Sequence, residues 1–254
     1  MLGKLIGYEY KSIGRLLLPL YFAAIILSVI TGIGIKINGS DNSILNMVDK
    51  LGFVGNTTMF IYGFFFVVVL IGTLSLSFVY GIVRFKANML DKEGYLMHTL
   101  PVSKNQHILA KLVGICTFQI LGVLIFSASY VIMISITYIG NINVNMFSDA
   151  FKVIFDTRFM SGMLEAVVTG LISLILFNLR LYACVSAGYS FNSHRLVCSI
   201  CALIVVSIVE GIVVSSALSA INIGVIQYNV VNIVLIVVYW AITAYYLKNK
   251  LNLQ

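Results

Sequence analysis

Six long apolar stretches constrain what this chain can fold into more than any other feature of its sequence. They cover residues 16–35, 58–83, 112–139, 163–187, 196–220 and 230–247 of 254. An α-helix needs about 20 mostly apolar residues to cross the hydrocarbon core of a bilayer. We therefore expect an all-α polytopic membrane protein with six transmembrane helices, forming a single transmembrane domain over residues 1–254.

The composition supports this assignment and excludes several other classes of protein. Apolar residues make up 60% of the chain and charged residues 10%, against about 45–50% and about 25% in an average soluble domain. These values exclude a disordered chain, a secreted disulfide scaffold and a free nucleic-acid-binding protein, and they argue strongly against a soluble enzyme.

The basic residues are distributed unevenly between the two sets of loops. Four lie on one side (Lys36, Lys50, Lys152 and Arg158), and Arg180 lies within a span. The other eleven flank the opposite ends of the spans: Lys4, Lys11, Arg15, Arg84, Lys86, Lys92, Lys104, Lys111, Arg195, Lys248 and Lys250. Because basic loops remain in the cytoplasm, both termini are expected there. This bias accounts for the net charge of +7, because the basic residues would face the anionic cytoplasmic leaflet of the membrane. A nucleic-acid partner is not needed to explain the charge.

The first 15 residues are expected to form an interfacial amphipathic helix. Wound as a helix, Lys4, Lys11 and Arg15 share one arc, opposite an apolar arc. Such a helix would lie in the headgroup layer before the chain turns into the first span. Glu9 falls on the apolar arc, where a carboxylate needs a partner. Its side chain either extends to the headgroups or pairs with a nearby basic residue, or it locks this helix onto another helix or subunit.

The loop over residues 84–111 is the most informative part of the chain. Phe85 and Met89 recur at helical spacing, so a short helix should continue out of the second span until Gly94 can end it. Ser103 and Gln106 have the spacing of a capping box that would start the next helix. Between these elements lies an apolar cluster made of Tyr95, Leu96, Met97 and Leu100. The cluster is either a membrane anchor for the loop or a docking knob for a cytosolic partner.

A family resemblance rests on these residues. The stretch Asn88-Met-Leu-Asp-Lys-Glu-Gly-Tyr-Leu-Met-His-Thr-Leu-Pro-Val resembles the cytoplasmic loop of permease subunits of type-2 ABC exporters from Gram-positive bacteria. The opening Leu5-Ile-Gly-Tyr-Glu-Tyr-Lys is similar to the family's N-terminal interfacial helix. The length, the six spans and the cytoplasmic termini agree in outline. The link at residues 221–229 is shorter than the re-entrant helices that many members carry there.

The resemblance implies a transport assembly in the bacterial cell membrane. Two permeases, identical or paired with a sister chain, would form the membrane part, and two cytosolic ABC ATPase subunits would bind their cytoplasmic side. A coupling helix between the second and third spans would enter the ATPase, with Glu9 bracing the contact. The coupling residues carried over from the family are Asn88, Leu90, Asp91, Glu93, Gly94, Tyr95, Leu96, Met97 and Leu100.

No phosphate-binding loop of the form G-x-x-x-x-G-K occurs in the sequence. We therefore expect no cofactor on this chain, with ATP and Mg bound by the partner ATPase. Histidine and carboxylate patterns typical of intramembrane metalloenzymes are also lacking, which disfavours an enzyme. A membrane scaffold or immunity protein without transport activity stays open as the alternative. The apolar spans favour a hydrophobic or amphipathic substrate, such as a peptide, antibiotic or lipid-like molecule.

Three ionisable residues lie within the spans and are candidates for the translocation path. Glu165 is close to the outer end of the fourth span and should reach water, and Arg180 could extend to the inner headgroups. Glu210 lies past the centre of the fifth span and is expected to face the bundle interior or a water-filled path. Because Arg180 and Glu210 differ by about 10 Å in depth, a direct pair would need both side chains extended or a tilt of the helices, and we do not expect one.

Two further patterns indicate packing rather than chemistry. Small residues recur at four-residue spacing, as in Thr73, Ser77 and Gly81, or Gly162, Ala166 and Gly170, and such stripes let helix backbones approach closely. Aromatic residues near span ends, including Tyr228, Tyr239 and Tyr245, are typical of interfacial belts.

Overall fold

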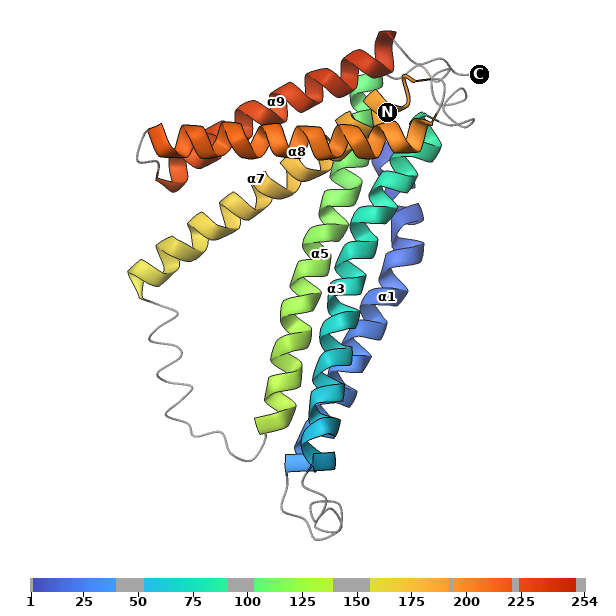
Figure 1. Cartoon of the computed structure of the whole chain (residues 1–254). Helices are drawn as coiled ribbons and strands as arrows, with labels where there is room; N and C mark the ends of the chain where they lie inside the picture. The colour runs from blue at the N-terminus through green and yellow to red at the C-terminus, as the bar shows by residue number, and fades with distance from the viewer. Residues whose placement is uncertain are drawn as a thin grey trace. The chain divides into compact units, whose positions relative to one another are not determined.

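The computed structural model describes residues 2–39, 53–90, 103–138, 156–191, 194–220 and 224–249. Nearly all of these residues belong to six α-helices (Figure 1). The helices are α1 (Leu2–Gly39), α3 (Phe53–Met89), α5 (Lys104–Tyr138), α7 (Thr157–Gly188), α8 (Arg195–Ala220) and α9 (Val225–Asn249).

The all-helical class predicted from the sequence is confirmed. Each described helix contains a segment that is long and apolar enough to cross a membrane, and each of the six predicted spans falls on a different helix. These helices are those of a multi-pass helical membrane protein.

The N-terminal segment differs from the expectation in one respect. Residues 2–39 form one continuous helix that carries Pro19 in its interior, without the expected turn before the first span. Ile13 and Leu17, on either side of the expected turn, are both buried, and Gly14 lets the ring of Phe118 approach the backbone of α1. Continuous burial of one helical face through this region favours an unbroken helix over a turn.

The chain forms two compact units. One of them comprises Lys11–Ser77 and Thr117–Lys152. Within it, parts of α1, α3 and α5 run side by side around a core of Ala24, Phe66 and Leu70 (Figure 1). The Tyr21 hydroxyl donates a 2.8 Å hydrogen bond to the Phe118 carbonyl. Gly122 allows this close approach, since a Cβ there would lie 2.8 Å from the Tyr21 hydroxyl oxygen.

The other unit comprises Met1–Tyr10, Phe78–Cys116 and Val153–Gln254. It therefore contains the start of α1, the end of α3, the start of α5 and the three helices α7, α8 and α9. Helix α7 packs against both α8 and α9, which touch each other little. The expected close approach at Gly81 is present, because a Cβ there would lie 2.7 Å from Ile115 Cγ1.

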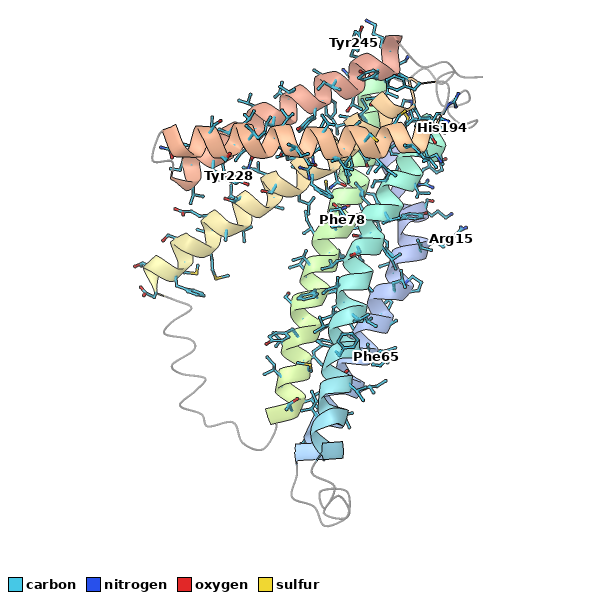
Figure 2. The ribbon with its side chains drawn as sticks, in the orientation of Figure 1. Arg15, Phe65, Phe78, His194, Tyr228 and Tyr245 are labelled. Atoms are coloured by element: carbon cyan, nitrogen blue, oxygen red, sulfur yellow. The ribbon has the colours of Figure 1, made fainter. Side chains whose placement is uncertain are left out.

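Many large apolar side chains are exposed on the described helices, as expected for surfaces that face lipid. On α8 they include Ile200, Ile204, Ile208 and Ile212, all more than half exposed. Phe65 is a comparable example on α3, and Tyr228 and Tyr245 lie near opposite ends of α9 (Figure 2).

Candidate functional site

A buried carboxylate with two cationic partners joins three helices. Glu9 of α1 accepts hydrogen bonds from Arg84 Nε of α3 at 2.7 Å and from Lys111 Nζ of α5 at 2.8 Å. The Glu9 and Lys111 side chains are only 4% and 3% exposed, and Arg84 is 23% exposed. We call these three residues the Glu9 cluster.

The Glu9 cluster decides between the two sequence-based interpretations of Glu9. Its partners come from two other helices of the same chain, so the carboxylate locks α1 onto α3 and α5. Removing one member of such a buried ion pair leaves its partner's charge uncompensated, which is strongly destabilising. The cluster therefore holds the three helix ends in a defined arrangement.

The ends of α3 and α5 beside this cluster are firmly packed. Met89 and Leu90 at the end of α3 are buried, and Asn88 is 6% exposed. At the start of α5, Ser103 N–H donates to Gln106 Oε1 at 3.3 Å, which is one of the two hydrogen bonds of the predicted capping box. Both ends of the chain segment over residues 91–102 are thus anchored.

Among the predicted coupling residues, Asn88 and Leu90 are described and buried. The others lie outside the described residues: Asp91, Glu93, Gly94, Tyr95, Leu96, Met97 and Leu100. The helical continuation of the second span through Phe85 is confirmed, because α3 extends to Met89.

Two further contacts connect these helix ends to α7 and α9. Phe85 of α3 stacks on Tyr182 of α7, with ring centroids 4.1 Å apart and planes 10° from parallel. The Lys104 ammonium of α5 donates a 2.6 Å hydrogen bond to the Leu247 carbonyl in the last turn of α9. Since the last carbonyls of a helix lack partners within it, this ammonium caps the end of α9.

A second polar cluster lies within the candidate spans of α7, α8 and α9. Arg180 Nη1 donates to Glu210 Oε2 at 3.1 Å, and the Tyr239 hydroxyl donates to the same oxygen at 2.9 Å. The Arg180 guanidinium also lies over the ring of Phe177, 5.0 Å from its centroid. We call Arg180, Glu210 and Tyr239 the Glu210 cluster.

The expectation that Arg180 and Glu210 do not pair directly was wrong, and the register of α8 explains why. A Cβ on Gly188 would lie 2.6 Å from Ser199 Cα, so α7 and α8 come together at Ser199 and not at the start of α8. Arg180 lies eight positions before Gly188, and Glu210 lies eleven positions after Ser199. At 1.5 Å per residue their levels differ by about 4–5 Å, which an arginine side chain can reach.

Sequence analysis assigned Tyr239 to an interfacial belt, which was wrong. Its side chain is buried, and its hydroxyl binds Glu210. Arg84, Lys111 and Phe85 were also not predicted as partners. For the two cations, the sequence offered one indication, which was the carboxylate of Glu9 on an apolar helical arc. That position requires a cationic partner, but it does not indicate which of the eleven basic residues on that side supplies it.

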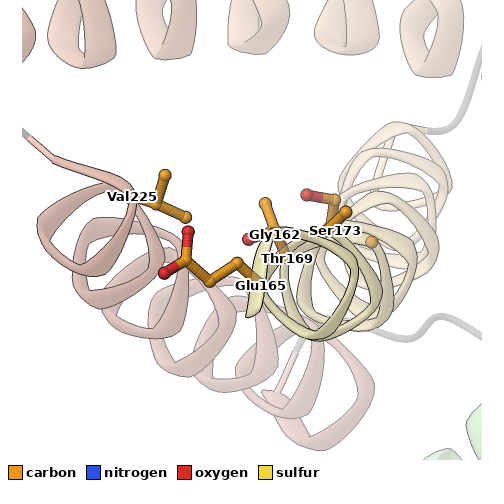
Figure 3. A pocket seen from close by; sticks show the side chains of 7 residues that line it. Gly162, Glu165, Thr169, Ser173 and Val225 are labelled. Atoms are coloured by element: carbon orange, nitrogen blue, oxygen red, sulfur yellow. The ribbon is translucent and has the colours of Figure 1, made fainter. Parts of the chain in front are cut away.

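Glu165, the third ionisable residue within a predicted span, lies apart from both clusters. It is exposed on α7, and among the described residues it has neither a hydrogen bond nor an ion pair. Its side chain lines a pocket between α7 and the start of α9 (Figure 3).

No group of three histidine, cysteine, aspartate or glutamate side chains in the described part of the chain is close enough to hold a metal ion. Comparison with protein-family models, curated proteins and solved structures found no match for the chain.

Proposed function

We propose that this protein is the permease subunit of an ATP-driven ABC exporter, and that separate cytosolic ATPase subunits drive it through the segment at residues 84–106. The observation that supports this proposal best is the Glu9 cluster. It fixes both ends of that segment to each other and to α1. A force applied to the segment would therefore move three helices together.

Packing provides a route for such a movement to reach the other helices. A displacement of α3 would press the Phe85 ring against Tyr182 of α7. Two residues before Tyr182, Arg180 is bound to Glu210 of α8, which also binds Tyr239 of α9. Coupling between distant sites travels through packed side chains and polar networks of this kind.

In this proposal the chain supplies the path and a partner supplies the energy. ATP and Mg would be bound by the ATPase, and a second permease, identical or a sister chain, would complete the membrane part. The protein would lie in a bacterial cell membrane with both termini in the cytoplasm, as the distribution of basic residues favours. The substrate would be a hydrophobic or amphipathic peptide, antibiotic or lipid-like molecule.

The test is co-purification of the tagged chain with an ATPase from membranes. Replacing Leu96→Asp or Tyr95→Asp places a charge in the apolar cluster of the segment, so the ATPase should be lost while the permease still inserts. Lys92→Gln, a polar exchange in the same segment, is the matched control and should retain the partner. An ATPase that still co-purifies with both aspartate variants would contradict docking at this segment.

Reconstitution separates a transporter from a scaffold. The permease in lipid vesicles should neither hydrolyse ATP nor move substrate until the ATPase is added. Turnover by the permease alone would contradict the proposal. An ATPase that binds and hydrolyses ATP without any transport, across peptide, antibiotic and lipid-like probes, would favour the scaffold or immunity protein.

A further inference from the structure

A groove on α7 remains unexplained by the coupling proposal. It has a volume of about 470 Å³ and is lined by Gly162, Glu165, Ala166, Thr169, Gly170, Ser173 and Val225. Figure 3 shows that the lining side chains come from α7, except Val225, which comes from the start of α9. Among the described residues, the lining contains one carboxylate and no basic side chain.

The floor of the groove is made of small residues that face free space. A Cβ built on Gly162 or on Gly170 meets no atom within 4 Å. Unlike Gly81, which lets Ile115 approach, these glycines accommodate no other part of the described chain. They leave room beside α7 for a group that the described part of the chain does not supply.

The polar atoms of the groove are mainly oxygens. The Glu165 carboxylate points across it toward Val225 (Figure 3) and has no ion pair among the described residues. Thr169 Oγ1 accepts a 3.0 Å hydrogen bond from Asn229 Nδ2. Asn229 does not itself line the groove; its Oδ1 atom is buried and has no hydrogen-bond partner within the described chain. A carboxylate with neighbouring acceptors suits a ligand that brings positive charge and N–H donors.

Position adds a second requirement. Glu165 lies six positions inside the candidate span Phe159–Gly188, so its carboxylate is close to the membrane boundary, where an amphipathic molecule places its charged group. Neighbouring side chains on α7, including Leu164 and Val168, are exposed and apolar. A ligand here would therefore place a cationic group at Glu165 and an apolar body against α7 and lipid.

We propose that this groove binds the ammonium group of an amphipathic amine, with Glu165 as its counter-ion. Two sources carry this chemistry: an aminolipid of the bilayer, or an exported amphipath with a free amine. In the second case the inference rests on the proposed function and names the substrate class of the exporter. Binding itself needs no ATPase, so it can fail while ATPase association holds, and the reverse.

The probe is a dansyl-labelled long-chain primary amine, titrated by fluorescence anisotropy into the protein in dodecyl maltoside, which is uncharged and contains no amine. The intact protein should bind it saturably. Glu165→Gln should weaken binding by about tenfold or more, because the counter-ion is lost. Asp156→Asn is the matched control, since Asp156 is exposed near the same end of α7 and does not line the groove. It should bind as the unmodified protein does.

Two further arms separate a specific site from partition into the micelle. The N-acetylated probe keeps the alkyl chain without the charge and should bind weakly to every variant. Gly170→Leu introduces a large side chain at a groove position where a Cβ meets no described atom within 4 Å, so this variant should lose the amine. Equal binding by Glu165→Gln and the unmodified protein, or by the amine and its acetylated form, would overturn the proposal.

Competition identifies the source of the amine. Displacement of the probe by phosphatidylethanolamine supports an aminolipid, and displacement by an amphipathic peptide with a free N-terminal amine supports an exported substrate. Displacement by neither contradicts the proposal. The circular dichroism spectrum and elution volume of each variant verify that it is folded.

Discussion

Lys111 Nζ lies 2.8 Å from Glu9 Oε1, although the two residues are 102 positions apart in the sequence, and both side chains are almost fully buried. Arg84 binds the second oxygen of the same carboxylate. The helices on either side of residues 91–102 are thus joined by a charged cluster that also includes Glu9 of α1. This relationship is the basis of the proposed coupling.

The Glu9 cluster should contribute strongly to stability. Glu9→Gln removes the carboxylate that binds the buried Lys111 ammonium, and breaking a buried ion pair in this way costs about 3–5 kcal/mol. The free energy of unfolding in detergent, measured by denaturant titration, should fall by an amount of this order. Lys11→Gln, at an exposed position of the same helix, should change it little.

A double variant checks the mechanism of that loss. Glu9→Gln with Lys111→Met removes the uncompensated ammonium and keeps an apolar side chain of similar length. It should recover much of the stability that Glu9→Gln loses, since apolar replacements of buried pairs are often tolerated. A double variant as unstable as the sum of its single variants would show that the two residues act independently.

The Glu210 cluster should show measurable coupling between α7 and α8. A double-mutant cycle of Arg180→Gln and Glu210→Gln is expected to give a coupling energy on the order of 0.5–2 kcal/mol, as for polar contacts between membrane helices. Tyr239→Phe removes one neutral donor and should cost less than Glu210→Gln. A coupling energy of zero would contradict the pair.

Gly81 should tolerate no side chain, whereas Gly72 on the same helix should accept one. A Cβ at Gly81 would lie 2.7 Å from Ile115 Cγ1, and a Cβ at Gly72 meets nothing within 4 Å. Gly81→Ala should therefore destabilise the protein by about 1–3 kcal/mol. Gly72→Ala should be neutral or slightly stabilising, because alanine favours the helix.

Relief of that clash provides a further check. Ile115→Ala removes the atoms that the new Cβ would meet, so Gly81→Ala with Ile115→Ala should be more stable than the sum of the two losses predicts. Thermal unfolding of the four proteins gives the comparison. Additive losses would show that the helices separate there instead of clashing.

The predicted orientation can be tested by cysteine labelling in intact cells. Lys11 and Asp156 are exposed and lie on opposite sides in the predicted topology. With Cys198 and Cys201 replaced by alanine, the buried Cys116 and Cys184 should stay unreactive. Asp156→Cys should then react with a membrane-impermeant maleimide, and Lys11→Cys should react only after permeabilisation. The opposite pattern would place the termini outside.

The helices could be predicted because their apolar runs are long, and length and composition alone identify a span. The continuity of α1 could not, since amphipathicity around Lys4, Lys11 and Arg15 does not reveal that Ile13 and Leu17 are buried on one continuous face. The pair of Arg180 and Glu210 depended on a helix register set by the contact between Gly188 and Ser199. Such offsets arise from tertiary packing, which the periodicity of one sequence does not encode.

The order of synthesis gives the Glu9 cluster another consequence. The ribosome makes Glu9 first, then Arg84 75 residues later and Lys111 102 residues later. At a synthesis rate of about 5–20 residues per second, Lys111 is added to the chain roughly 5–20 seconds after Glu9. The contacts that Glu9 makes with α3 and α5 can therefore form only after the start of α5 has been synthesised, so the position of α1 is fixed late.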